Sequence, residues 1–306
     1  MCRFLVYKGK EPALIADLIM RPAHSIINQS FDCRLRLEGC RFLNGDGFGV
    51  GWYDQYPEEG PCIFTSTLPA WSNINLKRIA EKIHSPLVFA HVRATTAGTP
   101  TSESNCHPWQ YGTLMWMHNG HLAQFPKIKR TLQNSLRDEM FSMVHGNTDS
   151  EWAFALFLNQ LEDPSATNFD PTVLKNAMLR TIELINMWSR EAGITQSSLL
   201  NFAVTDGRTV VCTRYVSSST LEAASLYYSS GSRFIERGGN YRMEKRDKRE
   251  DAVLIASEPL TFEKTDWVTI PSNTLLMVTP KHNILLYPIK DEFYNPGKRV
   301  LTVNNA

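Results

Sequence analysis

The chain begins with residues 1–8, MCRFLVYK, in which a cysteine precedes a run of aromatic, branched and leucine side chains. Side chains of these kinds fit the pleated surface of a sheet, so the stretch predicts a short strand at the start of the chain. It lacks the long apolar core and the small-residue cleavage site of a secretory signal. We therefore expect it to remain in the folded protein, with Cys2 at one end of the strand.

Further β signals lie on both sides of a helical middle region. The expected strands cover residues 2–8, 47–54, 61–67, 86–93, 113–118, 199–205, 209–216, 225–229, 252–257, 267–279 and 283–289. Asp206-Gly207 indicates a hairpin, and Gly238-Gly239 indicates another turn. The charged run 242–250 alternates in sign, which is typical of a solvated hairpin edge.

The middle region predicts helices with recognisable ends. Thr148 and Glu151 have the spacing of a capping box, and an apolar run follows them. A longer helix has Asp170 as its cap and Gly193 as its stop. Residues 76–83 are also helix-like.

The order of strands, helices and strands predicts one α+β domain over residues 2–306, in which helices cover two sheets on the outside. Residues 10–46 predict a long loop. A loop of that length is uncommon in a compact domain, so we expect it to carry function.

The composition excludes several classes of protein. Lys and Arg number 32 against 31 Asp and Glu, so the chain lacks the basic excess of a general nucleic-acid binder. No apolar run approaches the roughly 18 residues of a membrane span, and we expect a soluble, cytoplasmic protein. The six cysteines are irregularly spaced without a CxxC pair, so neither a disulfide framework nor a zinc site is expected.

Cys2 is the residue whose placement is most unusual. Initiator methionine is generally removed before small residues, which would leave Cys2 with both a thiol and a free α-amine. A cysteine thiol has a reference pKa of about 8.5 and an α-amine one of about 7.7–8.0. An α-amine near neutral pH can therefore take the proton of its own thiol, directly or through water. The alternative is an inert, buried cysteine near the chain start.

Three further motifs could take part in chemistry. Arg93 ends an expected strand and is followed by a turn that ends at Gly98, a placement suited to holding a carboxylate. Asn119 and Gly120 follow an apolar strand and could form an oxyanion hole from a side-chain amide and a backbone N–H. Asp149, in the first turn of a helix, could bind an ammonium group. Each motif also has an ordinary structural explanation: an ion pair, a turn and helix-dipole complementarity, respectively.

The Gly-rich stretch 44–51, NGDGFGVG, is not a dinucleotide-binding motif. It does not match GxGxxG, and no helix signal follows it.

Together the motifs resemble those of the class II glutamine amidotransferases, a branch of the N-terminal-nucleophile hydrolases. The matching elements, in the family's order, are residues 1–2, 93–98, 105–108, 118–120 and 148–151. Residues 1–5, 21–30, 44–49 and 198–207 are more closely similar to the amidotransferase subunits of fungal glutathione-degradation complexes. The resemblance implies a four-layer αββα sandwich of two mainly antiparallel sheets.

The resemblance also implies an activity. Cys2 would be the nucleophile, its freed amine the base, and Asn119 with Gly120 the oxyanion hole. The reaction would pass through a γ-glutamyl thioester, which water hydrolyses. The substrate would be glutathione, cleaved together with a metallopeptidase-like partner subunit, and no cofactor or metal would be needed.

The same resemblance assigns the substrate-binding residues. Arg93 would hold the α-carboxylate and Asp149 the α-amine, with Thr96 and His107 as supporting neighbours. One departure from the synthase-type members is Asn44-Gly45, where many of them have Arg-Gly. The way in which the chain start is held is therefore expected to differ.

Other interpretations stay open on the sequence alone. Glutamine shares its acyl half with glutathione, so the chain could be a glutaminase that delivers ammonia to a partner synthase. It could also be a scaffold subunit that has lost turnover. A Cys106–His107 nucleophilic pair is disfavoured because adjacent residues on an extended chain point to opposite faces. A metal site built from His118 and His121 does not have the usual zinc spacing.

Overall fold

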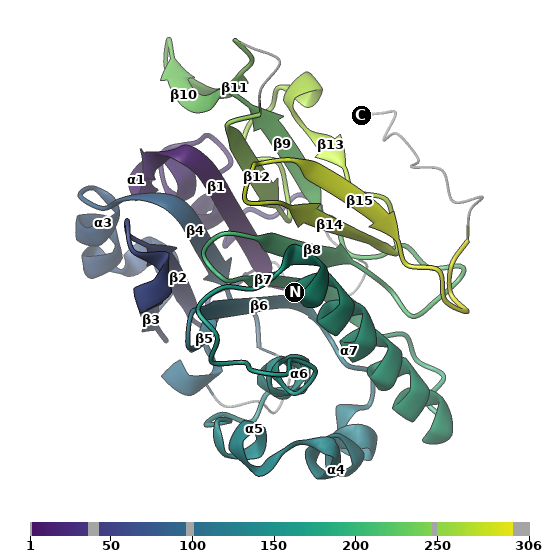
Figure 1. Ribbon diagram of the computed structural model, residues 1–306. Helices are drawn as coiled ribbons and strands as arrows, with labels where there is room; N and C mark the ends of the chain where they lie inside the picture. Colours follow the sequence, from purple (N-terminus) through teal and green to yellow (C-terminus); the bar gives the residue numbers. More distant parts are fainter. Residues whose placement is uncertain (1, 36–42, 96–100, 247–249, 296–306) are drawn as a thin grey trace.

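The strands form two large antiparallel sheets and one small hairpin within the described residues, 2–35, 43–95, 101–246 and 250–295, of this computed structural model (Figure 1). The seven-stranded sheet has, among these residues, the order β13 (Val268–Thr269), β9 (Tyr227–Gly231), β12 (Ala252–Ala256), β1 (Arg3–Leu14), β4 (His84–Val92), β2 (Phe48–Tyr53) and β3 (Cys62–Ser66). The six-stranded sheet has, in the same described ranges, the order β15 (Ile284–Pro288), β14 (Thr274–Val278), β8 (Val210–Arg214), β7 (Leu199–Thr205), β6 (Leu114–His121) and β5 (Trp109–Tyr111). Strands β10 (Arg233–Arg237) and β11 (Asn240–Glu244) pair as a separate hairpin.

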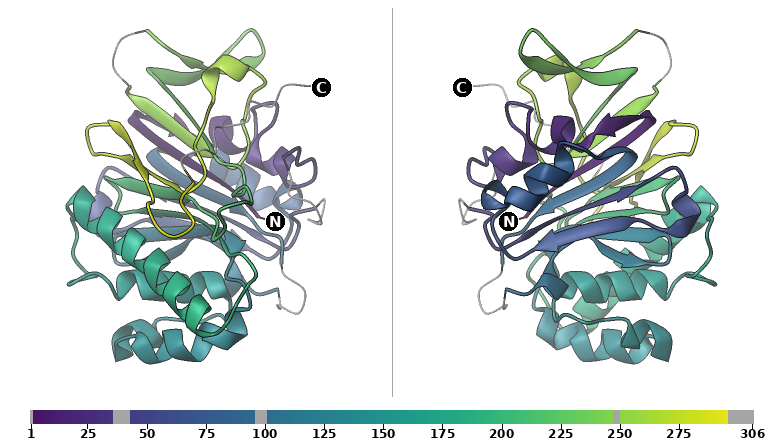
Figure 2. Two further views of the ribbon diagram at one scale, coloured as in Figure 1. Left: turned by 90° about the vertical axis from the view of Figure 1, so that its right-hand side faces the viewer. Right: turned by 90° about the vertical axis from the view of Figure 1, so that its left-hand side faces the viewer.

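The side chains of β1 alternate between two cores and so define the layers. Phe4 and Val6 pack in the core between the two sheets, against Met115 and Met117 of β6 among others. Leu5 and Tyr7 point to the opposite face, as the two-residue period of a strand requires. That outer face is covered by α1 (Ile15–Ile19), α2 (Ile26–Gln29) and α3 (Ile74–Ala80) (Figure 2).

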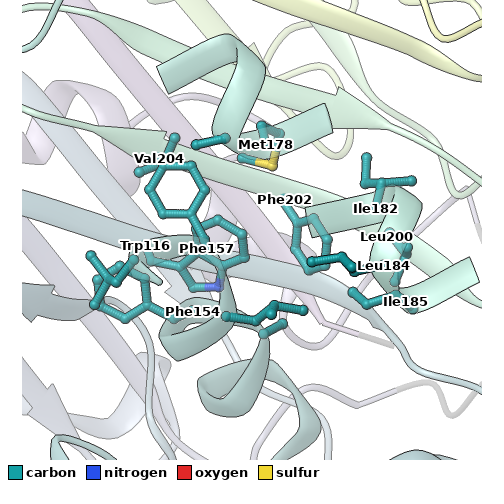
Figure 3. Packing of buried hydrophobic residues seen from close by; sticks show 14 of the residues in the cluster. Trp116, Phe154, Phe157, Met178, Ile182, Leu184, Ile185, Leu200, Phe202 and Val204 are labelled. Carbon is teal, nitrogen blue, oxygen red and sulfur yellow. The ribbon is translucent and has the colours of Figure 1, made fainter. Parts of the chain in front are cut away.

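The outer face of the second sheet carries the larger helical layer. It consists of α4 (Phe125–Ser135), α5 (Asp138–Ser142), α6 (Asp149–Leu158) and α7 (Pro171–Glu191) (Figure 1). Phe154 and Phe157 of α6 pack on Trp116 and Phe202 of the sheet (Figure 3). α6 is buried along nearly its whole length, because it lies between the sheet and the other helices.

The architecture is therefore the predicted α+β sandwich of two sheets between two helical layers. The hairpin at Asp206-Gly207 is confirmed, since Gly207 has a φ of 84° and Asp206 Oδ1 accepts the N–H groups of Arg208 and Thr209. The turn at Gly238-Gly239 is confirmed as well, and it joins β10 to β11. The long helix ends as expected before Gly193, whose φ is 64°.

Two expectations about local structure were wrong. Residues 10–46 are not one loop: β1 continues to Leu14, and α1 and α2 follow. Residues 267–279 are not one strand, because Pro271 lacks an N–H for a ladder and Asn273 adopts a left-handed φ of 53°. Helix α4 was not anticipated, and its N-cap residue, Gln124, makes no capping hydrogen bond that a sequence signal would reveal.

No helix in the described ranges combines the length and the apolar character that crossing a membrane requires.

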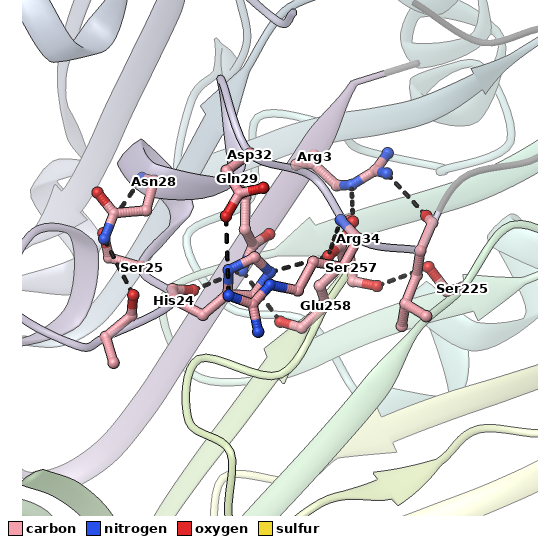
Figure 4. A network of polar contacts seen from close by, with 12 residues as sticks. Arg3, His24, Ser25, Asn28, Gln29, Asp32, Arg34, Ser225, Ser257 and Glu258 are labelled. Atoms are coloured by element: carbon pink, nitrogen blue, oxygen red, sulfur yellow. Dashed lines mark hydrogen bonds and ion pairs between the residues drawn. The ribbon is translucent and has the colours of Figure 1, made fainter. Parts of the chain in front are cut away.

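A buried carboxylate, that of Glu258, anchors the start of β1 (Figure 4). Glu258 Oε1 accepts from Arg3 Nε at 2.8 Å, while Oε2 lies 2.9 Å from His24 Nε2 and accepts from the Arg34 N–H at 2.9 Å. Burial by itself would raise the pKa of Glu258, but the His24 hydrogen bond, the Arg3 charge and the backbone donors outweigh it and lower the pKa. Arg3 Nη1 also donates to the Cys2 carbonyl at 2.9 Å, so the network reaches the expected nucleophile.

Replacing this carboxylate should destabilise the fold. We expect Glu258→Gln to lower the free energy of unfolding by about 3–5 kcal/mol, because it leaves the buried Arg3 guanidinium without its counter-charge. Glu183→Gln is the control, since Glu183 pairs with Arg180 on the surface and should change stability by less than about 1 kcal/mol. Urea denaturation measures both variants, and equal effects would show that the buried network does not anchor the strand.

Candidate active site

Five of the predicted site residues line one cavity of about 440 Å³. Its lining includes Cys2, Arg93, His107, Gly120 and Asp149. They come from the start of β1, the end of β4, the segment before β5, the end of β6 and the start of α6. The cavity therefore lies where ends of both sheets meet the larger helical layer.

Cys2 lies at the edge of this cavity with its sulfur against the peptide groups of Ala94. The Ala94 N–H donates to Cys2 Sγ at 3.3 Å, and Sγ lies 3.6 Å from the Ala94 carbonyl oxygen. The residue is only 9% exposed. The backbone of Ala94 therefore holds the Cys2 sulfur in place at the cavity.

Arg93 is buried and is one of the residues that line the cavity. Its Nη1 donates to the Asp46 carbonyl at 3.3 Å, and no carboxylate of the described residues forms an ion pair with it. A buried cation without a counter-charge is costly. The arrangement therefore suits an anionic ligand such as a substrate carboxylate.

Asp46 of the Gly-rich stretch holds the residues that directly follow Arg93, whereas the expected turn up to Gly98 lies outside the described residues. Asp46 N–H donates to the Arg93 carbonyl at 3.1 Å, and the Asp46 carboxylate accepts from Thr95 N–H at 2.8 Å and from Thr95 Oγ1 at 2.9 Å. Gly47 has a φ of 112°, and a Cβ there would lie 2.7 Å from Cys106 Sγ. The sequence analysis did not assign Asp46 a role. The one sequence feature that could have indicated it is the position of Asp46 between Gly45 and Gly47.

Gly120 is required by the close approach of two strands. A Cβ at this position would lie 1.8 Å from the Leu199 carbonyl oxygen on β7. Asn119 precedes it but is not among the residues that line the cavity. The Asn119 Nδ2 donates to Ser257 Oγ at 3.3 Å, and its Oδ1 is buried with no partner among the described residues.

Asp149 is the first residue of α6 and is one of the residues that line the cavity. Asp149 Oδ2 accepts from the Leu122 N–H at 2.7 Å, and Oδ1 lies 3.2 Å from Ser150 Oγ. The expected Thr148 cap is formed, since its hydroxyl accepts from the Glu151 N–H at 3.2 Å. The Glu151 carboxylate does not complete a capping box: it accepts instead from the N–H groups of His145 and Gly146.

His107 belongs to a group of buried histidines, His91, His107 and His118, of which His107 and His118 line the cavity. Its ring centroid lies 3.8 Å from that of His91 and 4.1 Å from that of Trp109. Neither ring nitrogen of His107 has a partner within the described parts of the chain. Burial lowers the pKa of all three histidines, His91, His107 and His118, and that of His91 falls to about 3. All three are therefore neutral at pH 7. Thr96, the remaining predicted neighbour, lies outside the described residues.

The alternative nucleophile, Cys106, is placed differently. Its Sγ contacts the carbonyl oxygens of Ser66 and Ser102 rather than the His107 ring. Burial raises the pKa of Cys106 to about 11, which keeps it a thiol. In the ranges that the structure describes, no three His, Cys, Asp or Glu side chains are grouped so that they could hold a metal ion.

Comparison with known proteins identifies the family. The model of the family described as glutamine amidotransferases class-II matches residues 23–287. The chain belongs to the class II glutamine amidotransferases. It is 52% identical to the "probable glutamine amidotransferase DUG3" of Saccharomyces cerevisiae, over 96% of this chain and 86% of the relative. The predicted family and the predicted enzyme class, a hydrolase of γ-glutamyl amides, are confirmed.

More distant relatives agree with this assignment. A γ-glutamyl-hercynylcysteine sulfoxide hydrolase of Mycolicibacterium smegmatis is 32% identical over 39% of this chain and 51% of its own length. Two solved structures share the fold. A class-II domain protein from Silicibacter pomeroyi has a TM-score of 0.63 at 23% identity, covering 94% of this chain and 99% of its own. The glutamine phosphoribosylpyrophosphate amidotransferase of B. subtilis has a TM-score of 0.58 at 15% identity, and the match covers 94% of this chain and 49% of that protein's chain.

The histidine cluster should make the fold sensitive to mild acid. An unfolded histidine has a pKa of about 6.5, whereas the pKa values of His91, His107 and His118 are lowered in the folded protein. Below pH ~6.5 the unfolded chain therefore binds more protons, and the free energy of unfolding falls as the pH falls. We expect a loss of about 1 kcal/mol per histidine between about pH 7.5 and about pH 5.5, measured by urea denaturation. A stability that stays level over this interval would contradict a neutral cluster.

Proposed function

We propose that this chain hydrolyses the γ-glutamyl bond of glutathione through a thioester on Cys2, together with a metallopeptidase-like partner subunit. The observation that carries the proposal is the shared cavity, in which the Cys2 sulfur lies with a cation and an anion suited to the two charges of a γ-glutamyl group. Arg93 would bind the α-carboxylate and Asp149 the α-ammonium. His107, with two unpaired ring nitrogens, would contact the same half of the substrate.

The chemistry follows from the properties of an N-terminal cysteine. Once Met1 is removed, the α-amine of Cys2 takes the thiol proton, and the thiolate attacks the γ-carbonyl carbon. Asn119 and Gly120 would stabilise the oxyanion that forms. The C–N bond then breaks, the proton passes from the Cys2 ammonium to the leaving amine, and a γ-glutamyl thioester remains. A water molecule, deprotonated by the same amine, hydrolyses the thioester to glutamate and restores the thiol.

The leaving group decides between glutathione and glutamine. Arg93 and Asp149 would contact only the γ-glutamyl half, which both substrates share. The cavity of about 440 Å³ lies in the range that accommodates ligands larger than an amino acid, and Leu122, Phe125 and Pro126 add an apolar wall to it. The mycobacterial relative is named for a γ-glutamyl substrate with a bulky leaving group. Both observations favour cysteinylglycine over ammonia as the leaving group.

The decisive experiment measures glutamate release from glutathione and from glutamine, separately, with and without the partner subunit. We expect release from glutathione by the processed protein, confirmed by mass spectrometry to begin at Cys2. Cys2→Ser should abolish most of it, because an alkoxide is far harder to form than a thiolate. Cys62→Ser is the matched control, since Cys62 is exposed and lies outside the cavity. Release from glutamine alone would favour the glutaminase alternative, and release from neither would favour a scaffold that has lost turnover.

A second variant tests the carboxylate site. We expect Arg93→Lys to raise KM for the γ-glutamyl substrate about tenfold or more, with a smaller effect on kcat, because lysine loses the bidentate fork that matches a carboxylate. Arg208→Lys is the control, since Arg208 pairs with Glu58 at the surface, away from the cavity. An unchanged KM in Arg93→Lys would remove Arg93 from the substrate-binding site.

A further inference from the structure

Ser257 joins the two parts of the site that must act on the same carbonyl group. It follows β12 directly, and no part of it is exposed. Its hydroxyl oxygen accepts from the Phe4 N–H at 3.0 Å and from Asn119 Nδ2 at 3.3 Å. Phe4 lies two residues from Cys2 on β1, and Asn119 lies on β6 of the other sheet. A single oxygen atom therefore connects the strand of the nucleophile to the expected oxyanion donor.

The backbone of Ser257 is itself firmly held. Its N–H donates to the Phe4 carbonyl at 3.0 Å, and its carbonyl accepts from Ser225 Oγ at 2.8 Å (Figure 4). The next residue, Glu258, anchors Arg3, which donates to the Cys2 carbonyl. The position of the Ser257 hydroxyl is thus fixed before any substrate binds.

This geometry matters because of how a side-chain amide donates. Asn119 Nδ2 carries two N–H groups, and Ser257 accepts one of them. That bond restricts the rotation of the amide and leaves the second N–H to be donated elsewhere. Asn119 Oδ1 has no partner among the described residues, so it does little to hold the amide plane. An oxyanion donor is effective only when its direction is set in advance.

We propose that Ser257 is a positioning residue of the active site, whose hydroxyl orients the Asn119 amide toward the oxyanion relative to the strand that carries Cys2. The proposal rests on the proposed function of Asn119 and Cys2 and extends it to a residue outside the cavity lining. It assigns Ser257 no contact with the substrate. Its effect is therefore expected in kcat and not in substrate binding.

The test compares Ser257→Ala with Ser229→Ala in the glutamate-release assay, with the partner subunit present. Ser229 is an ideal control: it is buried on the neighbouring strand β9, opposite Leu254 of β12, and its hydroxyl has no partner within the described chain. We expect Ser257→Ala to lower kcat by about 10-fold to 100-fold with KM within about twofold of wild type, because a small misplacement of a catalytic group costs that much. Ser229→Ala should leave both constants unchanged. Equal kcat values in the two variants would overturn the proposal.

A double-mutant cycle separates positioning from general destabilisation. If Ser257 acts through Asn119, then Ser257→Ala should have a clearly smaller effect in an Asn119→Ala background than in the wild type. A purely structural role predicts the same fold-loss in both backgrounds, and that result would overturn the proposal even if Ser257→Ala is less stable.

An NMR measurement, which does not depend on catalytic activity, tests the positioning role of Ser257 separately from the proposed hydrolase function. We expect NMR signals of the Asn119 side-chain amide to shift and to exchange faster with solvent in Ser257→Ala than in Ser229→Ala. A wild type that releases no glutamate from either substrate would contradict the proposed function and leave this readout in place. Asn119 signals that are the same in both variants would contradict the positioning role itself.

Discussion

The buried ion pair between Glu258 and Arg3 is the interaction on which the site depends most directly. A carboxylate in the interior is stable only when charges and hydrogen bonds replace its water shell, and Glu258 obtains these from Arg3, His24 and the backbone of Arg34. These partners come from the first strand and from the segment that was expected to be a loop. Because Arg3 also donates to the Cys2 carbonyl, the same charge network holds the backbone of Cys2 in place.

Sheet packing then brings the other groups to that point. The faces of β1 and β6 meet in the core between the sheets. Phe4, two residues after Cys2, and Asn119 therefore belong to different sheets and yet share one hydrogen-bond partner, Ser257. Neighbouring backbones can approach closely where one of the facing residues is a glycine, which has no Cβ. A Cβ at Gly49 would lie 2.0 Å from the His107 carbonyl oxygen, and one at Gly120 would meet Leu199 in the same way.

The charged residues that line the cavity are Arg93 and Asp149, one of each sign. The buried histidines are neutral and add no net charge, which leaves the Arg93 cation and the Asp149 anion as distinct poles. Such a pair suits a zwitterionic amino-acid head group and carries no information about what is attached to the γ-carbonyl. Under the proposed function, selection between leaving groups would belong to the apolar residues of the cavity around Phe125 or to surfaces supplied by a partner.

The sequence alone predicted most of the strands, the helix caps at Thr148 and Asp170, the family and part of the cavity lining, because these depend on local patterns and on motifs in a fixed order. It also predicted Asn119 for the site, but Asn119 does not line the cavity. It failed for residues 10–46 and for α4, because α1 and α4 have no side-chain N-cap and α2 is a single turn capped by Ser25. It also gave no role to Asp46, His91 or Ser257. Their importance comes from contacts with residues far along the chain, such as Ser257 with Asn119, and only the tertiary structure decides which distant groups meet.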